Sequence, residues 1–92
     1  HLPFCEMRCG FCNLFTTANP AADMQSAYLD ALERQVAAVR AEVGTFRPAQ
    51  MALGGGTPTL LSTQMLARVF DLLAHEMGGD PASISAGIET SP

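Results

Sequence analysis

The chain has 92 residues, of which 48% are hydrophobic and 15% are charged, a composition typical of a packed domain and not of a disordered segment. Five basic and nine acidic residues give a formal net charge of -4, and no stretch is rich in Lys or Arg, which argues against a surface for nucleic acid or anionic membranes. No apolar run reaches the roughly 18 to 20 residues of a membrane span, and the start does not resemble a signal peptide.

The chain opens with HLPFCEMRCGFC, which contains all three of its cysteines, Cys5, Cys9 and Cys12. The number is odd, and Cys9 and Cys12 are too close in sequence for an ordinary secreted disulfide framework. This pattern predicts free thiols in a reducing cytoplasm. We interpret HLPF as the end of a strand and residues 1–17 as the loop that carries the thiols.

A helix is predicted over about residues 20–43. Asn19 is its expected N-cap and Pro20 its first residue, where the missing N–H costs nothing. Apolar residues then recur at spacings of three and four, and Gly44 stands where a left-handed stop is needed. The expected packing stripe consists of Met24, Tyr28, Leu32, Val36, Val39 and Val43.

A turn at Pro48 and a short apolar strand come next. The strand is broken by Gly54, Gly55 and Gly56, and the strand and glycine-rich loop together cover about residues 50–58. Taken alone, three glycines at this point indicate a turn between a strand and a helix. A phosphate-binding loop is excluded because no Lys follows the glycines.

A second helix is predicted over about residues 63–77, with Ser62 as its cap and Gly78 at its end. Its buried stripe is expected to contain Leu66, Val69, Phe70, Leu73 and Met77. A last strand is predicted over about residues 83–90. It reaches Glu89 before the chain stops.

The order of strand, loop, helix, strand, loop, helix and strand, running from HLPF to the segment before Pro92, predicts an α/β fold. Such an order is typical of parallel strands joined by right-handed crossover helices. Functional loops of these sheets lie at the carboxyl ends of the strands. We therefore expect the cysteine loop, the glycine-rich loop and Glu89 to lie at the same edge of the sheet.

The spacing of the three thiols suits an iron–sulfur cluster, because short intervals let successive sulfurs reach different irons. Three thiolates hold three irons and leave the fourth open to a ligand, as a catalytic metal site does. The alternative is a zinc site in which His1 completes a set of three Cys and one His. The glycine-rich loop has no role in that alternative.

The C-x3-C-x2-C spacing, with an aromatic residue directly before the last Cys, resembles the radical S-adenosylmethionine superfamily. The strings HLPFCEMRCGFC, LGGGTPTLLS and IETSP are similar to its oxygen-independent coproporphyrinogen III oxidase-like branch. The resemblance covers essentially the whole chain. It implies that residues 1–92 are a fragment of one domain, the N-terminal portion of a partial (β/α)6 barrel with parallel strands and crossover helices.

The resemblance also implies which residues form the site. The expected ligands of a [4Fe-4S] cluster are Cys5, Cys9 and Cys12. The expected contacts of S-adenosyl-L-methionine are Phe11, Gly54, Gly55, Gly56, Thr57 and Glu89. The aromatic ring lies beside the adenine, and the glycine backbone receives the methionine ammonium, since glycine lets a backbone come close to a ligand. A solvated carboxylate at the strand end is the alternative for Glu89.

The implied chemistry is reductive cleavage of S-adenosyl-L-methionine to methionine and a 5′-deoxyadenosyl radical, which the cofactors supply. A porphyrin or heme-like small molecule is the implied substrate, and an electron donor such as flavodoxin or ferredoxin is the implied partner. No residue is assigned to act on the substrate. The oxidase carries a further Cys two positions after the third ligand, where this chain has Leu14. Leu14 favours a heme-chaperone-like or anaerobic heme-degrading paralogue.

Overall fold

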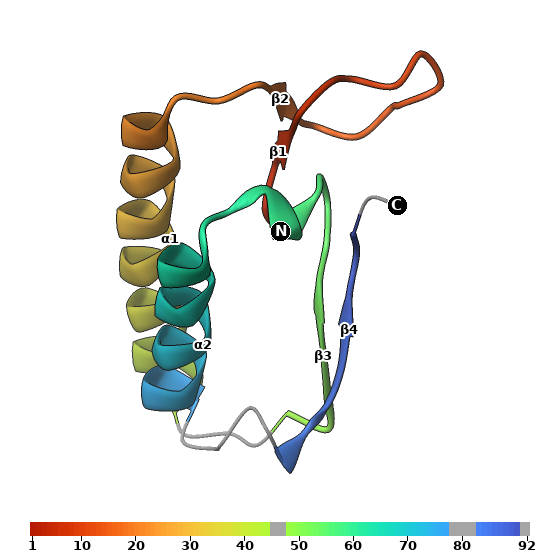
Figure 1. The fold of residues 1–92 in the computed structure, drawn as a ribbon. Helices are drawn as coiled ribbons and strands as arrows, with labels where there is room; N and C mark the ends of the chain where they lie inside the picture. The colour runs from red at the N-terminus through yellow and green to blue at the C-terminus, as the bar shows by residue number, and fades with distance from the viewer. Residues whose placement is uncertain (45–47, 78–82, 91–92) are drawn as a thin grey trace.

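The computed structural model describes residues 1–44, 48–77 and 83–90. The described elements are, in chain order, β1 (Phe4–Cys5), β2 (Thr17–Ala18), α1 (Ala22–Val43), β3 (Gln50–Leu53), the short 3₁₀ helix η1 (Pro58–Leu60), α2 (Thr63–Met77) and β4 (Ser85–Ile88). Figure 1 shows α1 and α2 side by side on one side of β3 and β4, with β1 and β2 at the top of the view.

Strands β3 and β4 are parallel, with Gln50 opposite Ser85 and Leu53 opposite Ile88. The N-terminal segment lies on the other edge of β3, where Leu2 forms a parallel bridge with Gly55. These pairings confirm the predicted parallel α/β arrangement. The described strands form two two-stranded sheets joined by this bridge, and they do not close a barrel.

The pairing of β1 with β2 was not predicted from the sequence. The two strands are parallel, with Phe4 opposite Thr17 and Cys5 opposite Ala18. The N–H of Thr17 donates to the carbonyl oxygen of Pro3 at 2.6 Å. The cysteine loop therefore has both of its ends fixed to each other.

The predicted N-cap of α1 was wrong, because the helix begins after Ala21 and not after Asn19. Asn19 has a φ of 50° and donates its N–H to the carbonyl oxygen of Cys5, so it still belongs to the β1–β2 pairing. Ala21 provides no side-chain hydrogen bond to the helix. At the other end, Gly44 has a φ of 73° and donates its N–H to the carbonyl oxygen of Arg40, so the helix ends at the predicted glycine with a positive φ.

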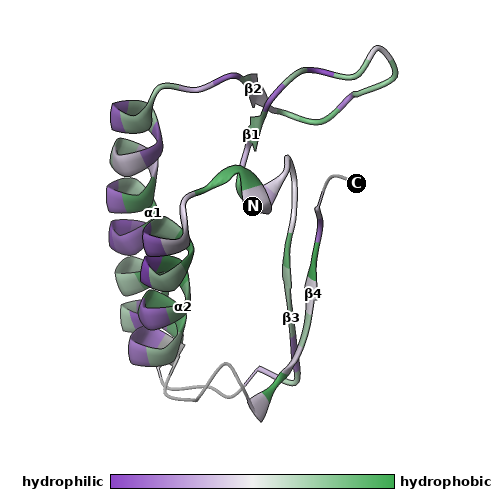
Figure 2. Cartoon of the chain, in the orientation of Figure 1, coloured by the Kyte–Doolittle hydropathy of each residue, from purple (hydrophilic) through white to green (hydrophobic). Residues whose placement is uncertain are grey.

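The hydrophobic core lies between the helices and the strands. Its buried members are Leu2, Phe4, Leu29, Leu53, Leu61 and Val69. Partly buried around them are Tyr28, Leu32, Met51, Leu60, Met65, Leu66, Phe70 and Leu73. Figure 2 shows hydrophobic, green surfaces of α1 and α2 turned toward the strands. The rings of Phe4 and Tyr28 meet edge to face with centroids 5.3 Å apart, an arrangement that aromatic quadrupoles favour.

The predicted packing stripe of α1 is only partly correct. Met24, Val39 and Val43 are 49%, 47% and 61% exposed. With 22 residues α1 is about 33 Å long, whereas the 15 residues of α2 span about 22 Å, so the shorter helix cannot cover the longer one. The side chain of Met77, the predicted helix end at Gly78 and the stop at Pro92 lie outside the described residues.

Two sets of ion pairs join α1 and α2. Arg68 contacts Asp30 and Glu33, and Arg40 contacts Glu76 at 3.3 Å. Hydrogen bonds from Arg68 to the two carboxylates raise the pKa of Arg68. Neither helix, as far as the chain is described, is long and apolar enough to cross a membrane.

Candidate metal and cofactor site

The glycine-rich loop after β3 is built around three close approaches by other groups of the protein. A side chain at Gly54 would lie 2.8 Å from the carboxylate carbon of Glu89, and one at Gly56 would lie 2.5 Å from the carbonyl oxygen of Phe4. Gly55 has a φ of 106°, and the imidazole of His1 lies where its side chain would be. Each glycine therefore leaves room for a different neighbour.

Glu89 lies at the end of β4 beside this loop, as the sequence predicted. Its carboxylate oxygen Oε2 accepts the N–H of Gly55 at 3.0 Å, and its own N–H donates to the carbonyl oxygen of Leu53 at 3.0 Å. The hydroxyls of Thr59 and Thr90 are hydrogen-bonded at 2.9 Å, which ties η1 to the segment after β4. The glycine-rich loop and Glu89 thus form one hydrogen-bonded unit.

The three thiols differ in their surroundings. Cys5 ends β1, is half-buried, and has its Sγ 3.9 Å from the hydroxyl of Thr57. Cys9 is exposed and Cys12 is half-buried, and the N–H of Cys12 donates to the carbonyl oxygen of Cys9 at 3.0 Å in a turn. All three are free of disulfide bonds.

The thiols fit a thiolate-bound metal group by their chemistry and by their position on one loop. The three sulfurs do not lie close enough together to form a metal site in this structure. Residues 1–44, 48–77 and 83–90 contain no group of three or more His, Cys, Asp or Glu side chains that could hold a metal ion. His1, the expected fourth ligand of the zinc alternative, places its Nε2 3.1 Å from the carbonyl oxygen of Phe15. Cys5 is thus the thiol with the firmest position, since it is the one within a strand.

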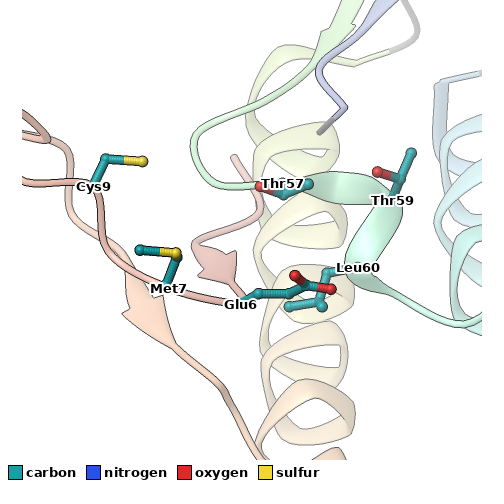
Figure 3. Close-up of a pocket in the computed structure, with 6 residues that line it drawn as sticks. All are labelled: Glu6, Met7, Cys9, Thr57, Thr59 and Leu60. Carbon is teal, nitrogen blue, oxygen red and sulfur yellow. The ribbon is translucent and has the colours of Figure 1, made fainter. Parts of the chain in front are cut away.

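A cavity of about 250 Å³ lies between the cysteine loop and η1. Residues of the cysteine loop and of the segment that follows the glycine-rich loop line it together. Its lining residues, drawn in Figure 3, are Glu6, Met7, Cys9, Thr57, Thr59 and Leu60. Cys9 and Thr57 were predicted site residues, whereas Glu6, Met7, Thr59 and Leu60 were not. Their only signal in the sequence was their position between motif residues. Phe11 does not line this cavity and is 91% exposed on the cysteine loop.

The N-terminal segment is fixed at the site by contacts to α1 and to the cysteine loop. The hydroxyl of Tyr28 donates to the carbonyl oxygen of His1 in a short hydrogen bond. Burial of the phenol raises the pKa of Tyr28. His1 therefore connects α1, the end of the cysteine loop at Phe15 and the glycine-rich loop at Gly55.

Three known proteins are similar to this chain in sequence over its whole length. Over 95 aligned residues, covering the whole chain, 30% are identical to the heme chaperone HemW of Bacillus subtilis. Over 92 residues, identity is 30% to the oxygen-independent coproporphyrinogen III oxidase of Escherichia coli. The mouse mitochondrial radical S-adenosyl methionine domain-containing protein 1 (Mus musculus) is likewise 30% identical over 92 residues. The chain belongs to the radical S-adenosylmethionine family.

The radical S-adenosylmethionine chain described here spans 24% of the length of the HemW relative and 20% of each of the other two. No family model and no solved structure matches it significantly. The names of these relatives include a heme chaperone and an oxygen-independent coproporphyrinogen III oxidase. These similarities support the family. They do not decide between a heme chaperone and a coproporphyrinogen oxidase.

Proposed function

We propose that this chain holds a [4Fe-4S] cluster through Cys5, Cys9 and Cys12 and binds S-adenosyl-L-methionine at the neighbouring glycine-rich loop. The observation that carries the proposal is the shared cavity, which Cys9 lines from one side and Thr57 from the other. The family membership supports it. When bound, the cluster supplies the electron that cleaves the sulfonium cofactor to methionine and a 5′-deoxyadenosyl radical.

The protein's own residues hold and orient these groups. Cys5 is fixed at the end of β1, and Cys9 and Cys12 lie on the loop whose ends β1 and β2 hold together. We assign to Glu89 the binding of cofactor donors, such as ammonium or ribose hydroxyls. Its carboxylate accepts a hydrogen bond from the N–H of Gly55. The two oxygens of a carboxylate can accept several hydrogen bonds, so this contact leaves capacity for a cofactor donor. Phe11, exposed on the cysteine loop, is the proposed contact of the adenine.

We assign the substrate to the porphyrin or heme class, with a reducing cytoplasm as the compartment and flavodoxin or ferredoxin as the type of electron donor. The names of the HemW and coproporphyrinogen oxidase relatives support the substrate class. Leu14 occupies the position where the oxidase has a further Cys, and its side chain is 49% exposed. An aliphatic side chain cannot replace a thiol, so Leu14 favours a heme-chaperone-like or anaerobic heme-degrading role as the second candidate.

Anaerobic reconstitution of the full-length protein with iron and sulfide tests the cluster. We expect a brown species that contains iron and sulfide in equal amounts and bleaches with dithionite. Replacing Cys5, Cys9 or Cys12 by Ser should each lower the iron content sharply, because a hydroxyl is a poor substitute for a thiolate. Asn13→Ser, an exposed change beside Cys12, is the matched control and should load normally.

Two outcomes would contradict the cluster. One is a colourless protein that binds zinc and takes up no sulfide. The other is full iron content after loss of any one thiol. Once the cluster is present, release of 5′-deoxyadenosine under reduction supports the enzyme. Heme binding without that release supports the chaperone.

A further inference from the structure

We propose that Thr57 is a positioning residue for the cluster itself: its hydroxyl donates a hydrogen bond to the sulfur of Cys5 and raises the reduction potential of the cluster held there. This inference rests on the proposed function. It gives Thr57 a role toward the thiolate ligand in addition to its expected contact with the sulfonium cofactor. The starting observation is the distance of 3.9 Å between the Oγ1 of Thr57 and the Sγ of Cys5.

The backbone around Thr57 is fixed to the strand that carries Cys5. The N–H of Thr57 donates to the carbonyl oxygen of Phe4 at 2.7 Å, and the N–H of Gly56 donates to that of Leu2 at 2.8 Å. A side chain at Gly56 would meet the backbone of Phe4, so only glycine permits this close pairing. Thr57 therefore faces Cys5 because two segments far apart in sequence are locked together.

The start of η1 fixes Thr57 from the other direction. The carbonyl oxygen of Thr57 accepts the N–H of Leu60 at 2.9 Å, and the buried Pro58 follows it directly. In the described part of the chain, the Sγ of Cys5 is the acceptor recorded for the Thr57 hydroxyl. The hydroxyl is thus held toward the sulfur by its own backbone.

The chemical consequence follows from the charge of the ligand. A hydrogen bond to a thiolate withdraws negative charge from the sulfur, which favours the reduced, more negative cluster and raises its potential. Among the residues that the structure describes, Cys9 and Cys12 have no side-chain donor recorded at their sulfurs. The three ligands are therefore unequal, and the iron bound by Cys5 receives the effect.

The experiment compares Thr57→Val with Thr57→Ser in the full-length protein after anaerobic reconstitution. Valine keeps the shape of threonine without the hydroxyl, and serine keeps the hydroxyl. We measure iron and sulfide content and the midpoint potential, by a redox titration followed with electron paramagnetic resonance. Thr57→Val should load the cluster and shift the reduction equilibrium about threefold to tenfold toward the oxidised state, at most about 59 mV for one electron. Thr57→Ser should stay within about twofold of the unchanged protein.

Thr59→Val is the matched control, because Thr59 lines the same cavity and its hydroxyl contacts Thr90 instead of a cysteine. It should leave the potential unchanged. An unchanged potential in a loaded Thr57→Val protein overturns the inference alone, as does an equal shift in Thr59→Val. If the unchanged protein takes up no cluster, the proposed function fails as well. Thr57→Ala provides a second hydroxyl-free variant if the valine protein does not fold.

Discussion

The carboxylate of Glu89 lies in the space that a side chain at Gly54 would need, and it accepts the N–H of Gly55 at 3.0 Å. The two residues are neighbours because β3 and β4 are parallel and in register up to Leu53 and Ile88. The glycine-rich loop is consequently shaped by the rest of the protein before any cofactor binds.

Gly54→Ala should displace Glu89 while leaving the fold intact. The new methyl group would lie 2.8 Å from the carboxylate, which is the far end of a flexible side chain and can move away. Loss of its hydrogen bond to Gly55 should cost about 1 kcal/mol of unfolding free energy. Faster hydrogen exchange at the Gly55 amide is the direct readout. Gly10→Ala, which meets nothing within 4 Å, is the control, and equal exchange in both variants would contradict the prediction.

Gly56→Ala should be much more damaging than Gly54→Ala. Its methyl group would lie 2.5 Å from the carbonyl oxygen and 2.7 Å from the nitrogen of Phe4, and these backbone atoms cannot move without opening the pairing with the N-terminal segment. We expect a loss of about 3 kcal/mol, the upper range for overpacking. Chemical denaturation of the two variants side by side measures the difference. A smaller loss for Gly56→Ala than for Gly54→Ala would show that the close approach is wrong.

The two helices should respond oppositely to changes at their N-caps. The Oγ of Ser62 accepts the N–H of Met65 at 3.1 Å, so Ser62→Ala should destabilise α2 by about 1 kcal/mol. Ala21 has extended backbone angles suited to an N-cap but no side-chain hydrogen bond, so Ala21→Ser should stabilise α1 by up to about 1 kcal/mol. Thermal or urea unfolding checks both signs. A gain from Ser62→Ala would contradict the assignment of the cap.

Stability should fall at alkaline pH because of Tyr28. Burial raises the pKa of this phenol in the folded chain above its ordinary value of 10.0, so the folded state holds the proton more tightly than the unfolded state does. The stability is therefore fully present below pH 10 and is lost as the pH rises through the folded pKa.

Tyr28 is the one tyrosine of residues 1–92, so a near-ultraviolet absorbance titration of this segment reports its ionisation alone. Tyr28→Phe is the matched control, since phenylalanine keeps the ring against Phe4 and cannot ionise. Urea unfolding of both proteins on either side of pH 10 should show a loss specific to the unchanged protein. Equal losses in both would exclude Tyr28 as the cause.

Local sequence signals predicted much of the fold. Ser62 caps α2, Gly44 ends α1, and the apolar run before the glycines forms β3, because each signal acts within a few residues. Asn19 was misassigned as a cap because its N–H is taken by the carbonyl oxygen of Cys5, a partner that local sequence does not reveal. The β1–β2 pairing was missed for the same reason, since two-residue strands carry little pattern.

The sequence predicted that the glycine-rich loop and Glu89 lie together, and it did not predict the contacts between them. The proximity of Glu89 to the glycines follows from parallel strands, which end at one edge of a sheet. That His1 fills the space at Gly55, and that Thr57 faces Cys5, depends on the packing of distant segments. A glycine-rich stretch predicts that another group comes close to the backbone, but it does not predict which group that is.

Residues 6–16 form a loop whose two ends are held together by the pairing of β1 with β2. Binding of a ligand by this loop therefore costs less conformational entropy, because the pairing of β1 with β2 has already closed the loop. This pairing joins only Phe4 with Thr17 and Cys5 with Ala18, and so short a pairing opens more readily than the helices do. On heating, a ligand bound by residues 6–16 should therefore dissociate when β1 and β2 separate, while α1 and α2 are still folded.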